Sequence, residues 1–289
     1  MLKEELRKNI VITGASSGIG KAIAEALIKD GHNLIICART IDSLKIISDD
    51  NKIALYKKVD VGVKQEVIDF ASFVDNHFGH VDALICCAGK FGAIGKFWEV
   101  SDDDWWDTLQ TNLFGTFLTI KHFTPLLKRA KAASVITFSG GGAFNSFPKY
   151  SAYATSKAAV VRLTETMAEE FKPLGISINA LAPGFVNTPI HLATLEAGPE
   201  VAGEDFYNYI KKKMEEGTVP ILVPVNCVRF LISDAANGLT GKTISANFDP
   251  WDSESFFNEI PNISKSDLYT MRRINKENIP NDKKWSGFD

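Results

Sequence analysis

Tyr153 and Lys157 are the residues whose types and spacing most directly suggest proton transfer. They lie four positions apart in a segment predicted to be helical, so their side chains share one face. A free phenol has a pKa of about 10, and a nearby lysine ammonium favours the ionised form and lowers that value. Such a pair can exchange a proton with a substrate near neutral pH. The spacing alone is a weak signal, because it usually marks two residues on a helix surface.

A glycine-rich turn, Thr13 to Gly20 (TGASSGIG), lies between the first apolar segment and the first helical pattern. Glycine permits a tight turn and lets the backbone approach a pyrophosphate, whose charge a helix N-terminus favours. The glycines are spaced G-x-x-x-G-x-G rather than G-x-G-x-x-G. The position after a strand and before a helix predicts a dinucleotide-binding turn rather than an ordinary loop.

Further motifs follow this turn in a fixed order: Cys86 to Gly89 (CCAG), Asn112, Tyr153 to Lys157 (YATSK) and Asn179 to Gly184 (NALAPG). Together they resemble the short-chain dehydrogenase/reductase family, in its single-domain branch. The resemblance extends from about Asn9 to Ala246. It implies an oxidoreductase that moves a hydride between a nicotinamide cofactor and a small carbonyl or alcohol substrate.

The resemblance also implies roles for individual residues. Tyr153 is expected to be the general acid/base, and Lys157 to favour its phenolate and hold the nicotinamide ribose. Asn112 is expected to position a water relay to the lysine, with a locally satisfied helix residue as the alternative. Asp60 is expected to meet the adenine amino group, with a strand-end cap as the alternative. The cofactor-binding set is Gly14, Ser16, Ser17, Gly18, Ile19, Gly20, Arg39, Asp60, Val61, Ala88, Gly89, Tyr153, Lys157, Pro183, Gly184, Val186 and Thr188.

The end of the second apolar segment, Cys37-Ala38-Arg39, bears on the choice of cofactor. In dinucleotide folds an acidic residue here binds the ribose 2′-hydroxyl, whereas a nearby arginine accommodates a 2′-phosphate. Family members that prefer NAD carry aspartate at the place of Ala38, and the Arg39 guanidinium can bind phosphate through two hydrogen bonds. NADP(H) is therefore expected rather than NAD(H), although Ser17 stands where many NADP-users carry a second basic residue. A solvated loop arginine is the alternative for Arg39.

The substrate-binding serine of the family is displaced in this chain. The family usually places it thirteen residues before the tyrosine, where this chain has Gly140 and where Ser139 is one position early. Either the glycine run that follows lets Ser139 take the role, or the hydrogen bond to the carbonyl comes from elsewhere. Losing one such donor can cost roughly 10²–10³ in rate. We therefore expect Ser139 to fill the role.

The four cysteines are Cys37, Cys86, Cys87 and Cys227. The adjacent pair replaces two asparagines of the family pattern, and both thiols are expected in the core because a catalytic cysteine needs exposure and an activating base. The number is small for the chain length, and adjacent cysteines lack the spacing of a zinc site. Reduced thiols in a cytoplasmic protein are expected.

The overall composition is that of an ordinary globular protein, with 45% hydrophobic and 23% charged residues in 289. A net charge of −3 gives no basic surface for nucleic acid or an anionic membrane. The sequence has no apolar stretch of membrane-spanning length, and its first residues lack the apolar core of a secretory signal. The five histidines show no metal-ligand spacing, so no metal is expected.

Strand-length apolar segments alternate with helical patterns along the chain. Buried strands alternating with helices predict an α/β fold of the Rossmann type, a doubly wound parallel sheet in a three-layer α/β/α sandwich. Ser101 and Asp104 predict a capping box, and Ser151 is the expected N-cap of the helix that carries Tyr153. The predicted strands are 9–12, 33–38, 54–60, 81–87, 133–138, 176–181 and 243–246; the predicted helices are 21–30, 65–78, 101–121 and 151–171, with 44–48 in another.

Residues 1–248 are expected to form one nucleotide-binding domain, and residues 249–289 a C-terminal extension outside the family pattern. The extension combines polar residues with four aromatic side chains and is expected to pack on the domain or on a neighbouring subunit: Trp251, Phe256, Phe257 and Trp285. The resemblance implies a homodimer or homotetramer, built through the helices that carry Asn112 and Tyr153.

Two other functions are compatible with parts of the pattern. A cofactor-binding regulatory protein that has lost catalysis would explain the displaced serine. A keto-sugar reductase or epimerase uses related chemistry, but those relatives look longer, carry G-x-x-G-x-x-G and add a separate substrate domain. The same core residues serve acyl thioesters, sugars, steroids and small ketones in the family, so the sequence does not specify the substrate.

Overall fold

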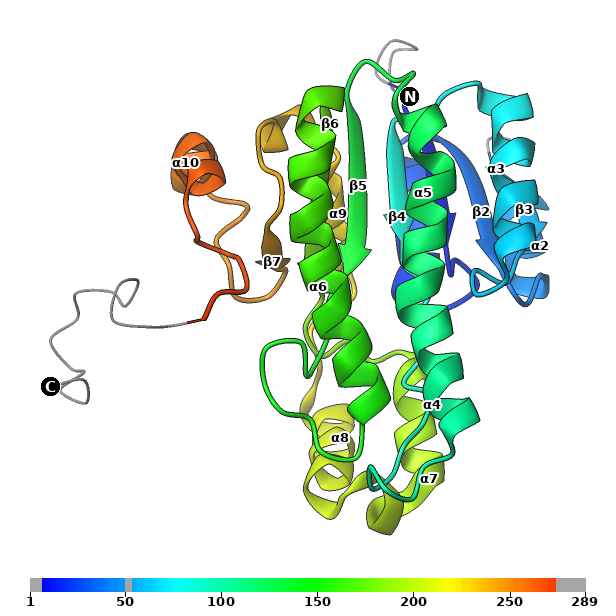
Figure 1. Cartoon of the computed structure of the whole chain (residues 1–289), viewed down its shortest axis with the longest axis vertical. Coiled ribbons are helices and arrows are strands. Elements are labelled where there is room, and N and C mark those ends of the chain that lie inside the picture. The colour runs from blue at the N-terminus through cyan, green and yellow to red at the C-terminus, as the bar shows by residue number, and fades with distance from the viewer. Residues whose placement is uncertain (1–6, 50–53, 274–289) are drawn as a thin grey trace, which may run out of the picture.

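The computed structural model describes residues 7–49 and 54–273, and its centre is a seven-stranded parallel sheet (Figure 1). The strand order is β3-β2-β1-β4-β5-β6-β7. The strands are β1 (Asn9–Thr13), β2 (Asn33–Ala38), β3 (Ala54–Lys58), β4 (Ala83–Cys86), β5 (Ala133–Phe138), β6 (Ile176–Ala182) and β7 (Thr243–Ser245). Strand order reverses at β1, so a crevice opens beyond the carboxyl ends of β1 and β4.

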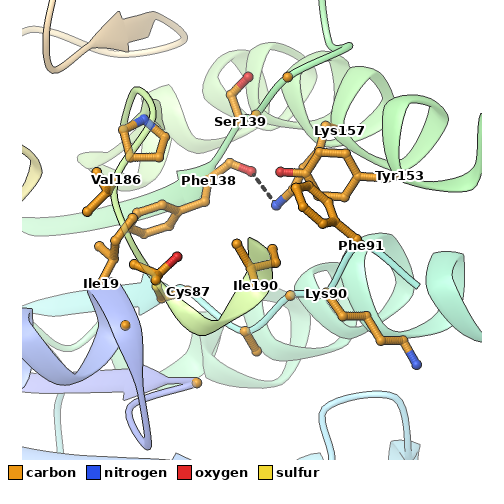
Figure 2. Close-up of a pocket in the computed structure, with 18 of the residues that line it drawn as sticks. Ile19, Cys87, Lys90, Phe91, Phe138, Ser139, Tyr153, Lys157, Val186 and Ile190 are labelled. Atoms are coloured by element: carbon orange, nitrogen blue, oxygen red, sulfur yellow. Dashed lines mark hydrogen bonds between the residues drawn. The ribbon is translucent and has the colours of Figure 1, made fainter. Parts of the chain in front are cut away.

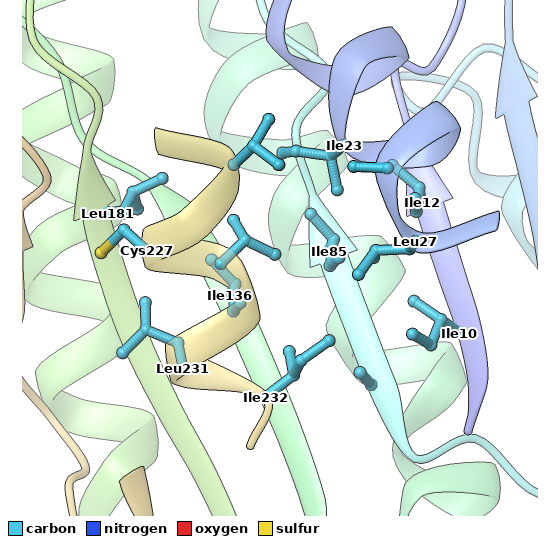
Figure 3. Close-up of a cluster of buried hydrophobic side chains, with 14 of the residues drawn as sticks. Ile10, Ile12, Ile23, Leu27, Ile85, Ile136, Leu181, Cys227, Leu231 and Ile232 are labelled. Carbon is cyan, nitrogen blue, oxygen red and sulfur yellow. The ribbon is translucent and has the colours of Figure 1, made fainter. Parts of the chain in front are cut away.

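Helices cover both faces of the sheet, which confirms the predicted three-layer fold. The core on one face is formed with α1 (Gly18–Lys29), α2 (Asp42–Asp49) and α9 (Leu222–Leu231). Figure 3 shows this core, in which Ile23 and Leu27 of α1 and Leu231 of α9 meet the isoleucines of the central strands. The core on the other face is formed with α3 (Lys64–Phe78), α5 (Gly115–Leu127) and α6 (Ser151–Phe171).

Most predicted elements are present, with small shifts at their ends. β2 and β5 have the predicted bounds, and five of the six residues in each strand are buried. The first helix begins at Gly18 rather than at residue 21, so the glycine turn leads directly into its first turn. The fourth strand is shorter than predicted at both ends, and Gly79 ends α3 in the left-handed conformation, with φ of 71°.

The predicted helix 101–121 is instead three consecutive helical pieces. These are α4 (Asp102–Leu109), a π-helical turn (Gln110–Phe114) and α5. The Ser101 hydroxyl accepts a hydrogen bond from the Asp104 amide at 3.1 Å, as the capping prediction requires. The π turn contains Asn112, and single π turns inside helices occur frequently at functional sites.

Ser151 is not the N-cap of α6, so this prediction is wrong. Tyr150 occupies the N-cap position, and Ser151 is the first helical residue. The Ser151 hydroxyl accepts a hydrogen bond from the Trp105 indole at 3.1 Å and thereby joins α6 to α4. The Ser151 hydroxyl therefore makes a contact between two helices instead of capping the start of its own helix.

The C-terminal segment wraps around the edge of the sheet beside β7. Trp251 and Phe256 pack against Phe230 of α9, and the helix α10 (Glu254–Lys265) follows. The Tyr269 carbonyl then accepts a hydrogen bond from the Thr243 amide of β7 at 2.8 Å, which covers an otherwise unpaired edge strand. Trp285, expected in the same arm, lies outside the described residues.

The two remaining helices, α7 (Leu192–Ala202) and α8 (Glu204–Glu216), lie beyond the carboxyl ends of the strands (Figure 1). Within residues 7–49 and 54–273, no helix combines the length and the apolar character needed to cross a membrane.

Candidate active site

A cleft of about 1200 Å³ lies at the carboxyl ends of the strands. It is lined by all the sequence-predicted site residues except Asn112, which is buried behind it. Figure 2 shows part of this cleft, with Tyr153 and Lys157 on one side and Ile19 and Cys87 on the other. The tertiary structure therefore brings together the predicted residues from seven separate segments of the chain.

Two glycines of the glycine turn, Gly14 and Gly20, have no room for a side chain. Gly14 has φ of 70°, and a Cβ built on it would lie 2.7 Å from the Ala88 backbone. A Cβ on Gly20 would overlap the Gly14 carbonyl. The turn and the first residues of α1 line the cleft. This turn fits the pyrophosphate of a dinucleotide.

The end of the cleft beside β2 and β3 carries both predicted ribose and adenine residues. Arg39 is exposed and lines the cleft directly after β2, where no carboxylate follows Ala38. Asp60 also lines the cleft, and its Oδ1 accepts a hydrogen bond from the Gly62 amide at 2.9 Å. The capping interaction expected as the alternative for Asp60 is thus formed, while its second oxygen has no recorded partner among the described residues.

Tyr153 and Lys157 are both buried beside each other on α6. The Lys157 Nζ lies 5.6 Å from the centre of the Tyr153 ring and donates a hydrogen bond to the Phe138 carbonyl at 2.9 Å. Burial raises the pKa of Tyr153 above its ordinary value, and burial lowers the pKa of Lys157 to about 8. Burial thus opposes the lowering of the tyrosine pKa that is expected from Lys157 together with an oxidised nicotinamide, and that expectation stays a prediction.

Asn112 joins the π turn to the cleft wall through three hydrogen bonds. Its Oδ1 accepts from the Lys90 amide at 2.9 Å, and its Nδ2 donates to the Lys90 carbonyl at 2.9 Å and to Ser156 Oγ at 3.0 Å. A Cβ built on Gly89 would lie 3.4 Å from the Asn112 Oδ1 and 3.6 Å from the Lys157 Nζ. Asn112 and Lys157 therefore flank the same point of the backbone.

Ser139 and Gly140 are arranged differently from the sequence prediction. A Cβ built on Gly140 would overlap the Tyr153 hydroxyl, so this hydroxyl occupies the volume that a serine side chain would need. The Ser139 hydroxyl points away from Tyr153 in Figure 2 and has no hydrogen-bond partner among the described residues. The structure thus places Ser139 in the cleft wall but not against the Tyr153 hydroxyl.

The adjacent cysteines have different surroundings. Cys86 is fully enclosed in the core, whereas Cys87 is partly exposed and lines the cleft. Burial raises the pKa of Cys87 to about 12, because desolvation exceeds the opposing effect of the Lys157 charge. The core position expected for both thiols holds for Cys86 only, and Cys87 is not a reactive thiolate. Among the described residues, no group of three His, Cys, Asp or Glu side chains could hold a metal.

An aromatic cluster beside Tyr153 was not predicted from the sequence. The Phe91 ring meets the Tyr153 ring edge-on at 4.7 Å and also contacts Tyr150 and His191. Phe147 and Phe206 complete the cluster. Phe91 follows the CCAG motif by two residues, and Phe147 and Tyr150 precede α6. In the sequence, the only indication of this cluster is that its aromatic residues lie close to the motifs. That the rings contact one another becomes visible only in the folded protein.

His191 closes the cleft from the segment after Pro183-Gly184. Its ring stacks on Phe185 at 4.3 Å and is 8% exposed. Burial lowers the pKa of His191 to about 4, although a hydrogen bond with the Val186 backbone opposes that shift. The imidazole is therefore neutral near pH 7, and its Nδ1 has no hydrogen-bond partner among the described residues.

Comparisons with known proteins agree with this geometry. A family profile described as short chain dehydrogenase matches residues 8–197. A short-chain dehydrogenase/reductase of Armillaria gallica is 33% identical over 247 residues, covering 82% of this chain and 93% of the relative. The 3-oxoacyl-[acyl-carrier-protein] reductase FabG of Staphylococcus epidermidis is 30% identical over 247 residues, covering 84% of this chain and 98% of its own.

Solved structures give the same result. A variant of actinorhodin polyketide ketoreductase with NADPH superposes with a TM-score of 0.75 and 26% identity, covering 85% of this chain and 97% of its own. The aldohexose dehydrogenase of Thermoplasma acidophilum has a TM-score of 0.71 and 28% identity, covering 83% of this chain and 92% of its own. The glycine turn, the Tyr153–Lys157 pair and these similarities lead to one conclusion: the chain belongs to the short-chain dehydrogenase family and is an NAD(P)-dependent oxidoreductase acting on CH–OH and C=O groups.

Proposed function

We propose that the protein is an NADP(H)-dependent carbonyl reductase or alcohol dehydrogenase with Tyr153 as its general acid/base. The observation that carries this proposal is the arrangement of Tyr153 and Lys157 in the same cleft as the glycine turn. The residues assigned to cofactor binding line the remainder of that cleft. A small molecule that carries a carbonyl or a secondary alcohol is the proposed substrate.

The buried tyrosine suits the reductive direction. A bound nicotinamide cofactor supplies the hydride. The Tyr153 phenol is protonated at neutral pH, as a phenol with its ordinary pKa of about 10 already is, and it can donate its proton to the carbonyl oxygen. The Lys157 ammonium, held by the Phe138 carbonyl, stabilises the phenolate that remains. Asn112 holds the Lys90 backbone beside Lys157, where a water relay could reach the ammonium.

The preference for NADP(H) rests on Arg39 and on the missing carboxylate after β2. An exposed guanidinium at this end of the cleft can bind a 2′-phosphate, and the position before it is Ala38, which carries no charge to repel a phosphate. The actinorhodin polyketide ketoreductase variant, a structural neighbour, was solved with NADPH. The proposed preference for NADP(H) over NAD(H) thus depends on the positive charge of Arg39.

The setting of the enzyme is part of the same proposal. We infer a cytoplasmic enzyme, because Cys37, Cys86, Cys87 and Cys227 are unpaired thiols in the structure. We also infer a homodimer or homotetramer, because Trp106 and Phe114 are 64% and 43% exposed on the helical segment that also contains the buried Asn112.

Replacing the tyrosine tests the proposed function. With saturating NADPH and a panel of ketones, Tyr153→Phe is expected to lower the turnover rate by about 10²–10⁴, since general acid catalysis contributes that much. The dissociation constant for NADPH, measured by fluorescence, should stay within about twofold of the wild-type value, because the ring and its packing remain. A fully active Tyr153→Phe enzyme would refute the role of Tyr153. Tight NADPH binding by the wild-type protein without turnover of any ketone would favour the regulatory alternative.

A further inference from the structure

One wall of the cleft beyond Tyr153 consists of aromatic rings. We name it the aromatic wall, and its six members all line the cleft: Phe91, Phe147, Phe185, His191, Phe206 and Tyr209. They come from the segment after β4, the loop before α6, the segment after β6 and helix α8. The match to the family profile ends at residue 197, so the rings of α8 lie outside it. The fold thus adds rings from four segments to the motif residues.

The rings of the aromatic wall contact one another in a series that begins at Tyr153. Phe91 meets the Tyr153 ring edge-on at 4.7 Å and the His191 ring at 5.6 Å, measured between ring centres. His191 stacks on Phe185 at 4.3 Å, and Phe185 meets Tyr209 edge-on at 5.5 Å. The segment after β6 and helix α8 are therefore joined to the catalytic tyrosine by ring contacts.

The same series returns to Tyr153 through the loop before α6. Tyr209 stacks on Phe206 at 6.1 Å, within helix α8. Phe206 meets Phe147 edge-on at 4.8 Å, and Phe147 meets Tyr153 edge-on at 6.3 Å. Because each ring contacts the next, the six side chains form one connected surface and not several separate ones.

Four rings of the aromatic wall keep accessible surface where they line the cleft. Phe147, Phe185 and Phe206 are half-buried, and Tyr209 is 43% exposed. Ligand pockets are typically lined by apolar and aromatic side chains of this kind. These four rings are therefore available to a ligand in the cleft.

A buried hydrogen bond holds the aromatic wall in place. The Tyr150 hydroxyl donates to Thr194 Oγ1 of α7 at 2.8 Å, and both residues are fully buried. The Tyr150 ring also stacks on Phe147 at 4.4 Å and meets Phe206 edge-on at 5.1 Å. Rings that are held before binding lose little conformational freedom when a ligand arrives, so their contacts contribute more to affinity.

The part of the cleft beside the aromatic wall has no counter-charge for an ionic group. Within the described segments 138–147 and 185–209, the residues that line the cleft include no Lys, Arg, Asp or Glu. His191 is neutral near pH 7, because burial lowers its pKa to about 4. The Lys90 ammonium pairs with Asp107 of α4, and in Figure 2 the Lys90 side chain points away from Tyr153. An ionic group here would lose water without gaining an opposite charge, so an uncharged group is favoured.

We infer that the aromatic wall binds an uncharged aromatic ring of the substrate, so that the enzyme acts on ketones that carry such a ring, or on the corresponding alcohols in reverse, in preference to saturated ketones of the same skeleton. This inference rests on the proposed function, because it places the reacting carbonyl at Tyr153. Phe206 and Tyr209 are then specificity-determining residues.

Ketone binding tests the inference separately from turnover. The probes are 4-phenylbutan-2-one and 4-cyclohexylbutan-2-one, titrated into the complex with NADP⁺, where a ketone cannot be reduced. The two ketones share one carbon skeleton, and the saturated ring is the bulkier, so burial of apolar area alone would not favour the phenyl ketone. The wild-type protein should bind the phenyl ketone about threefold to tenfold more tightly, because contacts between aromatic rings add to affinity beyond the burial of area.

Variants on α8 test the assigned residues. Phe206→Leu and Tyr209→Leu keep an apolar side chain and remove a ring, so each should lower the binding ratio about twofold or more. Phe97→Leu is the matched control and should leave the ratio unchanged, because Phe97 is 71% exposed and does not line the cleft. Thermal melting shows whether the variants remain folded.

Equal binding of the two ketones by the wild-type protein, or tighter binding of the cyclohexyl ketone, would overturn the inference. An unchanged ratio in both folded α8 variants would overturn it as well. If the phenyl ketone is preferred but no ketone is reduced with NADPH, the proposed function fails while the aromatic wall stands as a binding surface. Reduction of both ketones without any preference in binding would leave the proposed function intact and overturn only the inference.

Discussion

At the scale of single residues, the position of the Tyr153 hydroxyl explains the glycine that precedes it. In this chain the volume beside Gly140 is filled by that hydroxyl, so the missing serine reflects the space available. The sequence located the departure from the family pattern at Gly140. It could not reveal the overlap, because that depends on the distance between two segments that meet only in the folded protein.

Gly140→Ser should lower activity, although it restores the residue type of the family. The new Cβ overlaps the Tyr153 hydroxyl, so the tyrosine must move from its position, and kcat for ketone reduction is expected to fall about tenfold or more. Gly141→Ser is the matched control, since its Cβ would make only an ordinary contact of 3.5 Å with Phe147. Higher activity in Gly140→Ser than in the wild type would show that the site lacks a serine and not that it excludes one.

Arg39 is expected to determine the choice between the two nicotinamide cofactors. Arg39→Ala removes a charge-assisted contact worth about 1.5–3 kcal/mol, so KM for NADPH should rise about tenfold or more. KM for NADH should change little, because NADH has no 2′-phosphate. Steady-state kinetics with both cofactors measures this difference. An equal rise of both KM values would indicate that Arg39 contributes to cofactor binding in general and not to the 2′-phosphate.

At the scale of elements, the segments that surround the catalytic helix α6 each depend on it. The π turn is tied to α6 by the hydrogen bond from Asn112 to Ser156, and α4 by that from Trp105 to Ser151. The capping box at Ser101 and Asp104 predicted one uninterrupted helix over 101–121. It could not predict the π turn, because the residue that the turn positions has its partners on Lys90 and on α6.

The short helical turn Pro189–His191 and α7 cover the cleft, and their stability should depend on pH through His191. Its pKa is lowered to about 4 in the folded protein, against about 6.5 in the unfolded chain. For a base with a lowered folded pKa, the unfolded chain binds the proton first as the pH falls. The stabilisation is therefore complete above pH of about 6.5 and is lost progressively towards pH of about 4.

His191→Gln should reduce this loss of stability in acid. The measurement is the free energy of unfolding in urea at pH 7 and pH 5, and the difference between the two should be smaller in the variant. His77→Gln, on the exposed face of α3, is the control and should behave as the wild type. The same pH dependence in His191→Gln and in the wild type would contradict the burial of a neutral imidazole at this position.

At the scale of the whole molecule, the C-terminal segment covers one edge of the sheet and leaves one helical face open. Tyr269 pairs with β7, whereas Trp106 of α4 and Phe114 of the π turn remain exposed. In Figure 1, α4 and α10 lie on opposite sides of the view. Phe114 stacks on Phe117 at 5.8 Å, so the two rings form a continuous apolar surface. An open apolar surface of this kind is typical of subunit interfaces.

Trp106→Asp should weaken the proposed assembly. The wild-type protein is expected to run as a dimer or tetramer in light scattering, and the variant should shift towards smaller species at the same concentration, because a carboxylate would be buried unpaired in the interface. Leu174→Asp is the control, since Leu174 is 38% exposed next to the end of α6 and away from this face. A monomeric wild-type protein would remove the inferred homo-oligomer altogether.

The sequence by itself determined the fold class, the family and the catalytic pair. Apolar segments at strand length, a glycine turn between strand and helix, and four-residue spacing on a helix are local features, so they can be identified without knowing the fold. The direction of the Tyr153 and Lys157 pKa shifts and the overlap at Gly140 were decided only by the tertiary structure. Each of these depends on burial or on contacts between residues far apart in the chain, which local patterns do not record.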